Sequence, residues 1–197
     1  MLQSPLLKEY NEATFSMKLT EIKALTKEKS SVFLRELQEM CLVCGVVIVY
    51  VPNIKHTHFG GAATWVGGRP IVMLKAEKQY EDTFWFNFFH EAGHILKHSK
   101  KEFFVDFENG KKTEVEKEAD SFAQKTLVPN FEELLRESAT IKGESVESWL
   151  YRASRSVGIT PNIIAGRLCN EMKDRCKDIW RFFSSERPVI QEKISAV

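Results

Sequence analysis

The sequence predicts an α+β domain in which a small mixed or antiparallel sheet of about three strands packs on a buried helix and is followed by further helices. Three features of the sequence predict this class. Val46–Val51 is a β-branched run that stops at a proline, residues 60–74 hold short apolar segments separated by glycine pairs, and residues 83–98 are apolar at helical spacing. At 197 residues, the chain is long enough for one domain with a modest extension.

The first elements are predicted to be helices followed by a strand. Residues 1–40 are polar and carry apolar side chains at helical spacing, which predicts one or two amphipathic helices. The run Val46–Val51 is apolar without alternation, which is typical of a strand buried on both faces. We therefore expect this strand to be central in the sheet.

A hairpin is predicted next. The pairs Gly60-Gly61 and Gly67-Gly68 bracket the first strand, Ala62–Val66, and Ile71–Leu74 forms the second. Because both strands are short and bounded by glycine, one of them is a candidate for an exposed sheet edge, which can pair with an extended peptide. The residues proposed for that edge are Ala62, Ala63, Thr64 and Trp65.

The segment Thr83–His98 is apolar nearly all round at helical spacing, so the helix that it predicts is buried. A short strand within residues 103–107 and a turn at Asn109-Gly110 come next. Another helix is predicted to begin near Thr113 and to end before Pro129.

The remainder is predicted to be helical, with helices over Phe131–Glu137, Ser145–Val157 and Pro161–Lys177 and a loose tail from Ser184. We therefore expect the chain to divide into N-terminal helices at residues 1–40, a core at 41–130, a helical part of the same domain at 131–183, and the tail at 184–197.

Charge and composition exclude several classes of partner. The formal net charge is +1, so no overall basic field favours nucleic acid. The longest uncharged apolar run, Met40–Val51, is about a dozen residues, whereas a membrane-spanning helix needs roughly 20. The chain does not open with a secretion signal, and we expect a cytoplasmic protein with no membrane partner.

Cys41 and Cys44 form a C-x-x-C pair, a spacing found in zinc and redox sites. They lead directly into an apolar strand, and free cysteines are commonly buried as small hydrophobic residues. Cys169 and Cys176 do not supply a second C-x-x-C. We therefore expect the cysteines to be reduced and buried rather than metal-bound.

The strongest chemical signal is His90-Glu91-Ala92-Gly93-His94, an H-E-x-x-H motif in the middle of the buried helix. Residues four apart share a helix face, so His90 and His94 can direct two imidazoles at one point, with Glu91 beside them. Polar groups in so apolar a helix are costly to bury unless they are paired or bound to metal. The motif predicts one Zn²⁺ per chain.

A catalytic zinc takes three protein ligands, so a third must come from elsewhere. His98 lies about 6 Å further along the helix axis than His94 and is rejected. In the acidic cluster of the next helix, Glu118 is expected to face solvent and Glu116 is preferred, with Asp120 as hydrogen-bond partner of a ligating histidine. The alternative for Glu116 is a capping box with Thr113.

Three segments together resemble the ImmA/IrrE-like zinc metallopeptidases: residues 60–71, residues 90–98 with the H-E-x-x-H motif, and residues 116–129. The resemblance implies a gluzincin-like site in which His90, His94 and Glu116 are ligands and Glu91 is the catalytic general base. It also implies a regulatory role, because members of this family cleave or inactivate helix-turn-helix repressors in mobile-element induction and stress responses.

Many members of the family carry a helix-turn-helix of their own, but residues 1–40 show no clear one. Nucleic acid is therefore expected only as an indirect partner, or through a domain absent from this chain. One alternative is a metal-binding sensing module of a transcription regulator or antitoxin, without proteolysis. Another is DNA binding through Ser154–Leu168. The second oxyanion donor stays open among five residues, namely His56, His58, His98, Tyr151 and Arg167.

Overall fold

The computed structural model describes residues 8–52, 59–98, 104–105, 113–173, 177–185 and 187–193. Its fold is α+β, with a small mixed sheet and helices before and after it, as the sequence predicts. The N-terminal helices α1 (Glu12–Ala24) and α2 (Ser30–Val43) are joined by the 3₁₀ turn η1 (Leu25–Lys27). The turn expected at Asn109-Gly110 lies outside the described residues.

The sheet has the strand order β1-β3-β2-β4. The predicted hairpin is confirmed: β2 (Gly61–Val66) pairs antiparallel with β3 (Arg69–Lys75), and the turn residues Gly67 and Gly68 have φ of +58° and +79°. Both values lie in the left-handed region that glycine adopts without a steric penalty, so this glycine pair suits the tight turn. The strand predicted within residues 103–107 is the two-residue β4 (Phe104–Val105).

The expectation that the first strand is central is wrong. β1 (Val47–Val51) pairs in parallel with β3 and lies at one edge of the described sheet, with β3 between it and β2. Val49 on this strand is 39% exposed. The apolar run instead fits a strand that meets α2, whose Gln38 side chain donates a hydrogen bond to the carbonyl of Ile48. The continuous apolar run was interpreted as burial on both faces, but only Ile48 of β1 is buried and Val49 is exposed.

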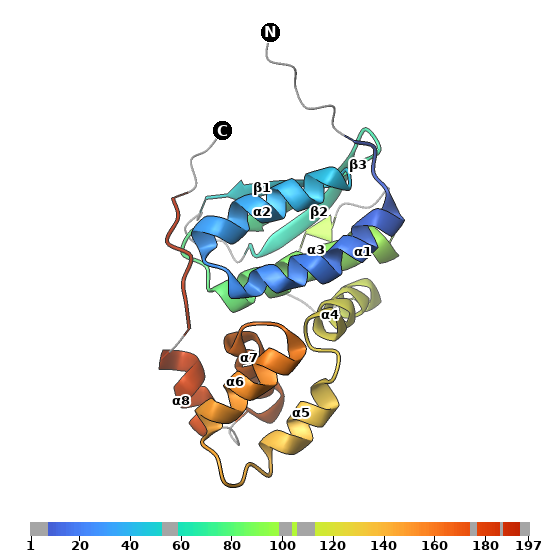
Figure 1. The fold of residues 1–197 in the computed structure, drawn as a ribbon. Helices are drawn as coiled ribbons and strands as arrows, with labels where there is room; N and C mark the ends of the chain where they lie inside the picture. Colours follow the sequence, from blue (N-terminus) through green and yellow to red (C-terminus); the bar gives the residue numbers. More distant parts are fainter. Residues whose placement is uncertain are drawn as a thin grey trace.

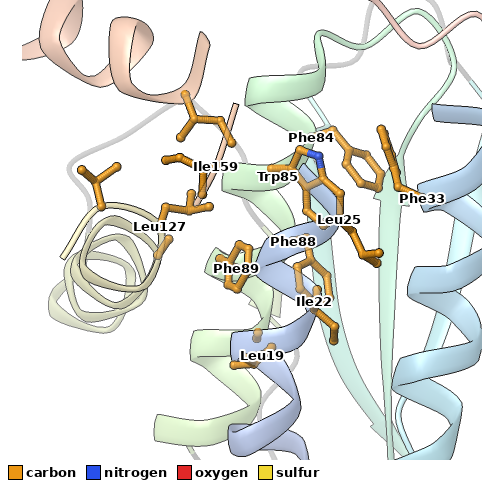
Figure 2. Close-up of a cluster of buried hydrophobic side chains, with 14 of the residues drawn as sticks. Leu19, Ile22, Leu25, Phe33, Phe84, Trp85, Phe88, Phe89, Leu127 and Ile159 are labelled. Carbon is orange, nitrogen blue, oxygen red and sulfur yellow. The ribbon is translucent and has the colours of Figure 1, made fainter. Parts of the chain in front are cut away.

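Figure 1 shows α1, α2 and α3 (Glu81–Lys97) together beside the sheet, and Figure 2 shows the core that they share. Along β3, alternate residues are buried, including Val72 and Leu74. The aromatic side chains of α3 supply much of the remaining core, and the rings of Phe33 and Trp85 lie 4.9 Å apart between α2 and α3. The free thiols of Cys41, Cys44 and Cys169 are buried, as expected.

The C-terminal helices α5 (Phe131–Ser138), α6 (Val146–Val157), α7 (Pro161–Met172) and α8 (Lys177–Ser185) gather on the side of α3 and α4 away from the sheet (Figure 1). The single helix expected over 161–177 is wrong, because α7 ends at Met172 and Lys173 has a φ of +50°. In the described residues, no helix is long and apolar enough to cross a bilayer.

The tail expected to be loose is instead attached to the domain over residues 187–193. Ile190 is fully buried, and its backbone N–H donates to the carbonyl of Gln79. The guanidinium of Arg187 donates to both carboxylate oxygens of Asp82, at 2.8 and 2.9 Å. Helical periodicity carries no information about such contacts with a distant segment, which explains the error.

Candidate metal centre

The site lies where α3 meets α4 (Glu114–Leu127), which packs closely against it. Gly93 and Ala119 allow this approach, because a Cβ on Gly93 would lie 3.2 Å from Cα of Ala119. The two helices run in opposite directions at this contact, since His90 meets Asp120 and the later residue His94 meets the earlier Glu116. A small residue on each helix therefore brings the acidic end of α4 to the histidines of α3.

Three ligand atoms converge there. The Nε2 atoms of His90 and His94 are 3.0 Å apart, and the Glu116 carboxylate lies 3.0 Å from His90 Nε2 and 3.4 Å from His94 Nε2. All three candidate atoms lie within 4.8 Å of one another, and both histidines are 2–3% exposed. In the described part of the chain, His90, His94 and Glu116 form the cluster of histidines, cysteines and carboxylates suited to a metal.

These residues fit zinc. Two imidazoles and one carboxylate are a common ligand set of catalytic zinc, which leaves its fourth position for water or substrate. In a tetrahedral site with bonds of about 2.0–2.1 Å, neighbouring ligand atoms lie about 3.3 Å apart. The two Nε2 atoms, 3.0 Å apart, and the two oxygens of Glu116, one 3.0 Å from His90 Nε2 and the other 3.4 Å from His94 Nε2, lie close to that separation.

Burial also keeps one ligand in the form that a metal needs. Desolvation, followed by the proximity of His90 and His98, lowers the pKa of His94 to about 3. His94 is therefore neutral near pH 7, and metal ligation requires a neutral imidazole with a free lone pair.

The backbone and the side chain of Glu116 have different partners. Its backbone N–H donates to Oγ1 of Thr113 at 3.3 Å, so Thr113 caps α4 as predicted. The Glu116 carboxylate, however, reaches the two histidines instead of returning to the cap. Capping of the backbone thus fixes the start of α4 and leaves the side chain available for the metal.

Asp120 lies behind His90. Its Oδ1 is 2.9 Å from His90 Nδ1, which is the ring nitrogen away from the ligand cluster. A carboxylate in this position accepts the Nδ1–H and thereby leaves the Nε2 lone pair for a metal. The sequence predicts this geometry, and the role in metal binding stays a prediction.

Glu91 lies on a different face of α3, towards β2, and is 2% exposed. Its carboxylate packs against Gly61, where an added Cβ would lie 2.9 Å from Oε1 and 3.1 Å from Cγ of Glu91. Gly61 therefore has a specific reason to lack a side chain: it makes room for the carboxylate beside the site. Glu91 is adjacent to a ligand in sequence without belonging to the ligand cluster.

His98 is not part of the ligand cluster, as the sequence predicts, but it is not a surface residue either. Its Nδ1 lies 2.9 Å from Nδ1 of His94, and its Nε2 lies 3.1 Å from Oε2 of Glu118. Sequence reasoning missed this contact. The available signal was the spacing of four residues from His94, which places both rings on one side of the helix.

The strand edge proposed for substrate is only partly open. All four residues pair with β3, and Ala62 and Ala63 also pair with β4, the last strand of the described sheet. Of the candidate oxyanion donors, His56 and His58 lie outside the described residues.

Two further candidates have other contacts. The guanidinium of Arg167 donates to the carbonyls of Gln124 and Val128 near the end of α4, and the ring of Tyr151 packs on Phe182. Arg167 and Asp120 both line a cleft of about 640 Å³ between α3, α4, α7 and α8, which none of the three ligand residues lines. These contacts favour a structural role for Arg167 and Tyr151.

DNA binding through Ser154–Leu168 is not supported. This stretch forms the end of α6, a turn at Gly158 with φ of +80°, and most of α7. A recognition helix must expose side chains to the major groove, but α7 buries half of its residues in the domain. Its buried residues are Asn162, Ile163, Ile164, Ala165, Leu168 and Cys169.

Comparison with known proteins identifies a family for most of the chain. The model of the Peptidase_M78 family, described as the IrrE N-terminal-like domain, matches residues 44–168, which is more than half of the chain. The matched region contains the H-E-x-x-H helix, the glutamate helix and most of the C-terminal helices. A search of curated proteins finds no match. With two buried histidines and a glutamate arranged to hold a metal ion, the chain belongs to the Peptidase_M78 family of metallopeptidase-type proteins.

Proposed function

We propose that this protein is a zinc-dependent endopeptidase of the regulatory type, which cleaves or inactivates a helix-turn-helix repressor. The observation that carries the peptidase part is the arrangement around α3. His90, His94 and Glu116 offer three ligand atoms to one ion, while the neighbouring Glu91 carries its carboxylate on another face. A hydrolytic metal site needs both parts, because a ligand set alone supplies no group that moves protons.

In the proposed mechanism, zinc, when bound by these ligands, supplies a Lewis acid that polarises the scissile carbonyl and makes a water molecule acidic. Glu91 accepts a proton from that water as its oxygen bonds to the carbonyl carbon. Glu91 then donates this proton to the leaving amine as the C–N bond breaks. Asp120 holds His90 in one orientation throughout.

We further propose that the substrate binds in an extended conformation along β2. The part of β2 beyond its pairing with β4, at Thr64, would offer its backbone to one strand of a partner, on the side away from β3. Binding of this kind relies on main-chain hydrogen bonds, so selectivity for particular side chains would be weak. An exposed interdomain linker of a repressor is the type of segment that can adopt this conformation.

The test is incubation of the zinc-loaded protein with purified helix-turn-helix repressors, followed by intact-mass measurement. Two fragments whose masses sum to that of the repressor plus one water are expected, and a sample stripped of zinc by a chelator should produce none. Zinc binding without cleavage of any repressor or unstructured protein would contradict the peptidase proposal and favour the non-proteolytic sensing module.

A further inference from the structure

The outer nitrogens of the two ligand histidines meet different partners. Nδ1 of His90 faces a carboxylate, Asp120, whereas Nδ1 of His94 faces Nδ1 of a third histidine, His98, at 2.9 Å. The far nitrogen of His98 then lies 3.1 Å from Oε2 of Glu118 on α4. The His98 side chain is only 7% exposed, whereas the Glu118 side chain is 67% exposed, so water reaches the Glu118 end of these contacts.

The protons in this chain of contacts can be assigned. Two imidazole nitrogens can share a hydrogen bond only if one donates and the other accepts. If Nε2 of His94 gives its lone pair to a metal, the proton of the neutral ring is on Nδ1, which must donate to His98. Nδ1 of His98 therefore accepts, and the proton of neutral His98 is on Nε2, where it can donate to Glu118.

We propose that His98 is a positioning residue for the zinc ligand His94, and that Glu118 holds His98 in the tautomer that can do this. The inference rests on the proposed zinc site, and it assigns His98 no contact with substrate or metal. Partners of this kind fix the orientation of a ligand ring and raise its basicity. The contacts from His98 to Glu118 also link the end of α3, the H-E-x-x-H helix, to α4, the helix that supplies Glu116.

The position of His98 explains why an imidazole suits this place. The regular part of α3 ends at Lys97, and His98 is the extended C-cap residue with φ of −116° and ψ of 168°. Its N–H still bonds to the carbonyl of His94, so its ring stays close to the His94 ring, with centroids 5.0 Å apart. From there the imidazole ring can contact both partners, with Nδ1 towards His94 and Nε2 towards Glu118.

The first test is zinc affinity, measured on the full chain by competition with a chromophoric chelator at fixed pH. His98→Ala should bind zinc about 10- to 100-fold more weakly, the usual loss when such a partner is removed. His98→Asn should recover most of this loss, because its side-chain oxygen can accept from His94 in place of Nδ1. Glu118→Ala should cause a smaller loss, because its exposed carboxylate is screened by water.

The matched control is Glu114→Ala on the same helix, whose carboxylate is exposed and pairs with Lys117. It should bind zinc as the parent does. Zinc affinity of His98→Ala equal to that of the parent would overturn the inference. So would a failure of His98→Asn to exceed His98→Ala.

The second test needs no variant and reads the proton positions directly. Long-range ¹H–¹⁵N NMR spectra of the zinc-loaded parent should show His98 neutral with its proton on Nε2, and His94 with its proton on Nδ1. A His98 with its proton on Nδ1, or with both nitrogens protonated, would contradict the inference while leaving the zinc site intact. A parent that binds no zinc would instead contradict the proposed function itself, and this inference with it.

Discussion

Two faces of α3 carry different functional side chains. The face towards α4 carries His90 and His94, which meet Glu116 and Asp120 at 2.9–3.4 Å. The face towards β2 carries Glu91, which packs against Gly61. The candidate metal site is thus a property of the contact between two helices, whereas the proposed proton transfer is a property of the contact between a helix and a strand. Substitutions on the two faces should therefore separate zinc affinity from the rate of hydrolysis.

The largest separation is expected for Glu91→Gln. This change removes the group that accepts the proton, so the rate of peptide cleavage should fall about 10²- to 10⁴-fold. Zinc content should remain at the parent value, because Glu91 is outside the ligand cluster. Cleavage assays and metal analysis of one preparation check both parts. If this variant cleaves at the parent rate, Glu91 is not the base.

A smaller effect on the same face is expected for Gly61→Ala. The new Cβ would lie 2.9 Å from Oε1 of Glu91 and would displace the carboxylate. A shift of about 1 Å in a reacting group costs up to roughly 100-fold in rate, so a loss of about 10- to 100-fold is expected with zinc affinity retained. Ile71→Val, which changes the opposite face of the sheet, is the control. Equal cleavage rates for Gly61→Ala and the parent would show that the catalytic role of Glu91 does not depend on its contact with Gly61.

The smallest effect is expected on the other face, for Gly93→Ala. Its Cβ would meet Cα of Ala119 and the ring of Phe122, both at 3.2 Å. Overpacking of this kind costs about 1–3 kcal/mol, so thermal unfolding should occur at a lower temperature. Zinc affinity should fall as well, because Glu116 moves away with α4. Lys117→Ala on the exposed side of α4 should change neither quantity. Weaker stability with unchanged zinc affinity would show that the site tolerates separation of the helices.

The metal cluster was predictable because its information is local. The spacing of His90 and His94 fixes their common face in any helix, and the small residue Ala119 indicated which side of the next helix could approach. Glu116 followed from that choice, and the structure brings its carboxylate to both histidines. The hairpin was also predictable, because its glycine pair specifies the turn.

What the sequence did not predict depends on contacts between distant segments. The edge position of β1 follows from its parallel pairing with β3, which no local pattern encodes. The attachment of residues 187–193 depends on Asp82 and Gln79, about a hundred positions earlier in the chain. The partnership of His98 with Glu118 needs both the end of α3 at Lys97 and the position of α4.

We expect one zinc ion to be held between α3 and α4 by His90, His94 and Glu116. The most direct test is zinc per chain, measured by elemental mass spectrometry after dialysis, for the parent and for Glu116→Ala, with circular dichroism to establish that both are folded. About one zinc per chain is expected in the parent and much less in the variant. A folded parent without zinc would contradict the claim, and an unchanged variant would move the third ligand away from Glu116.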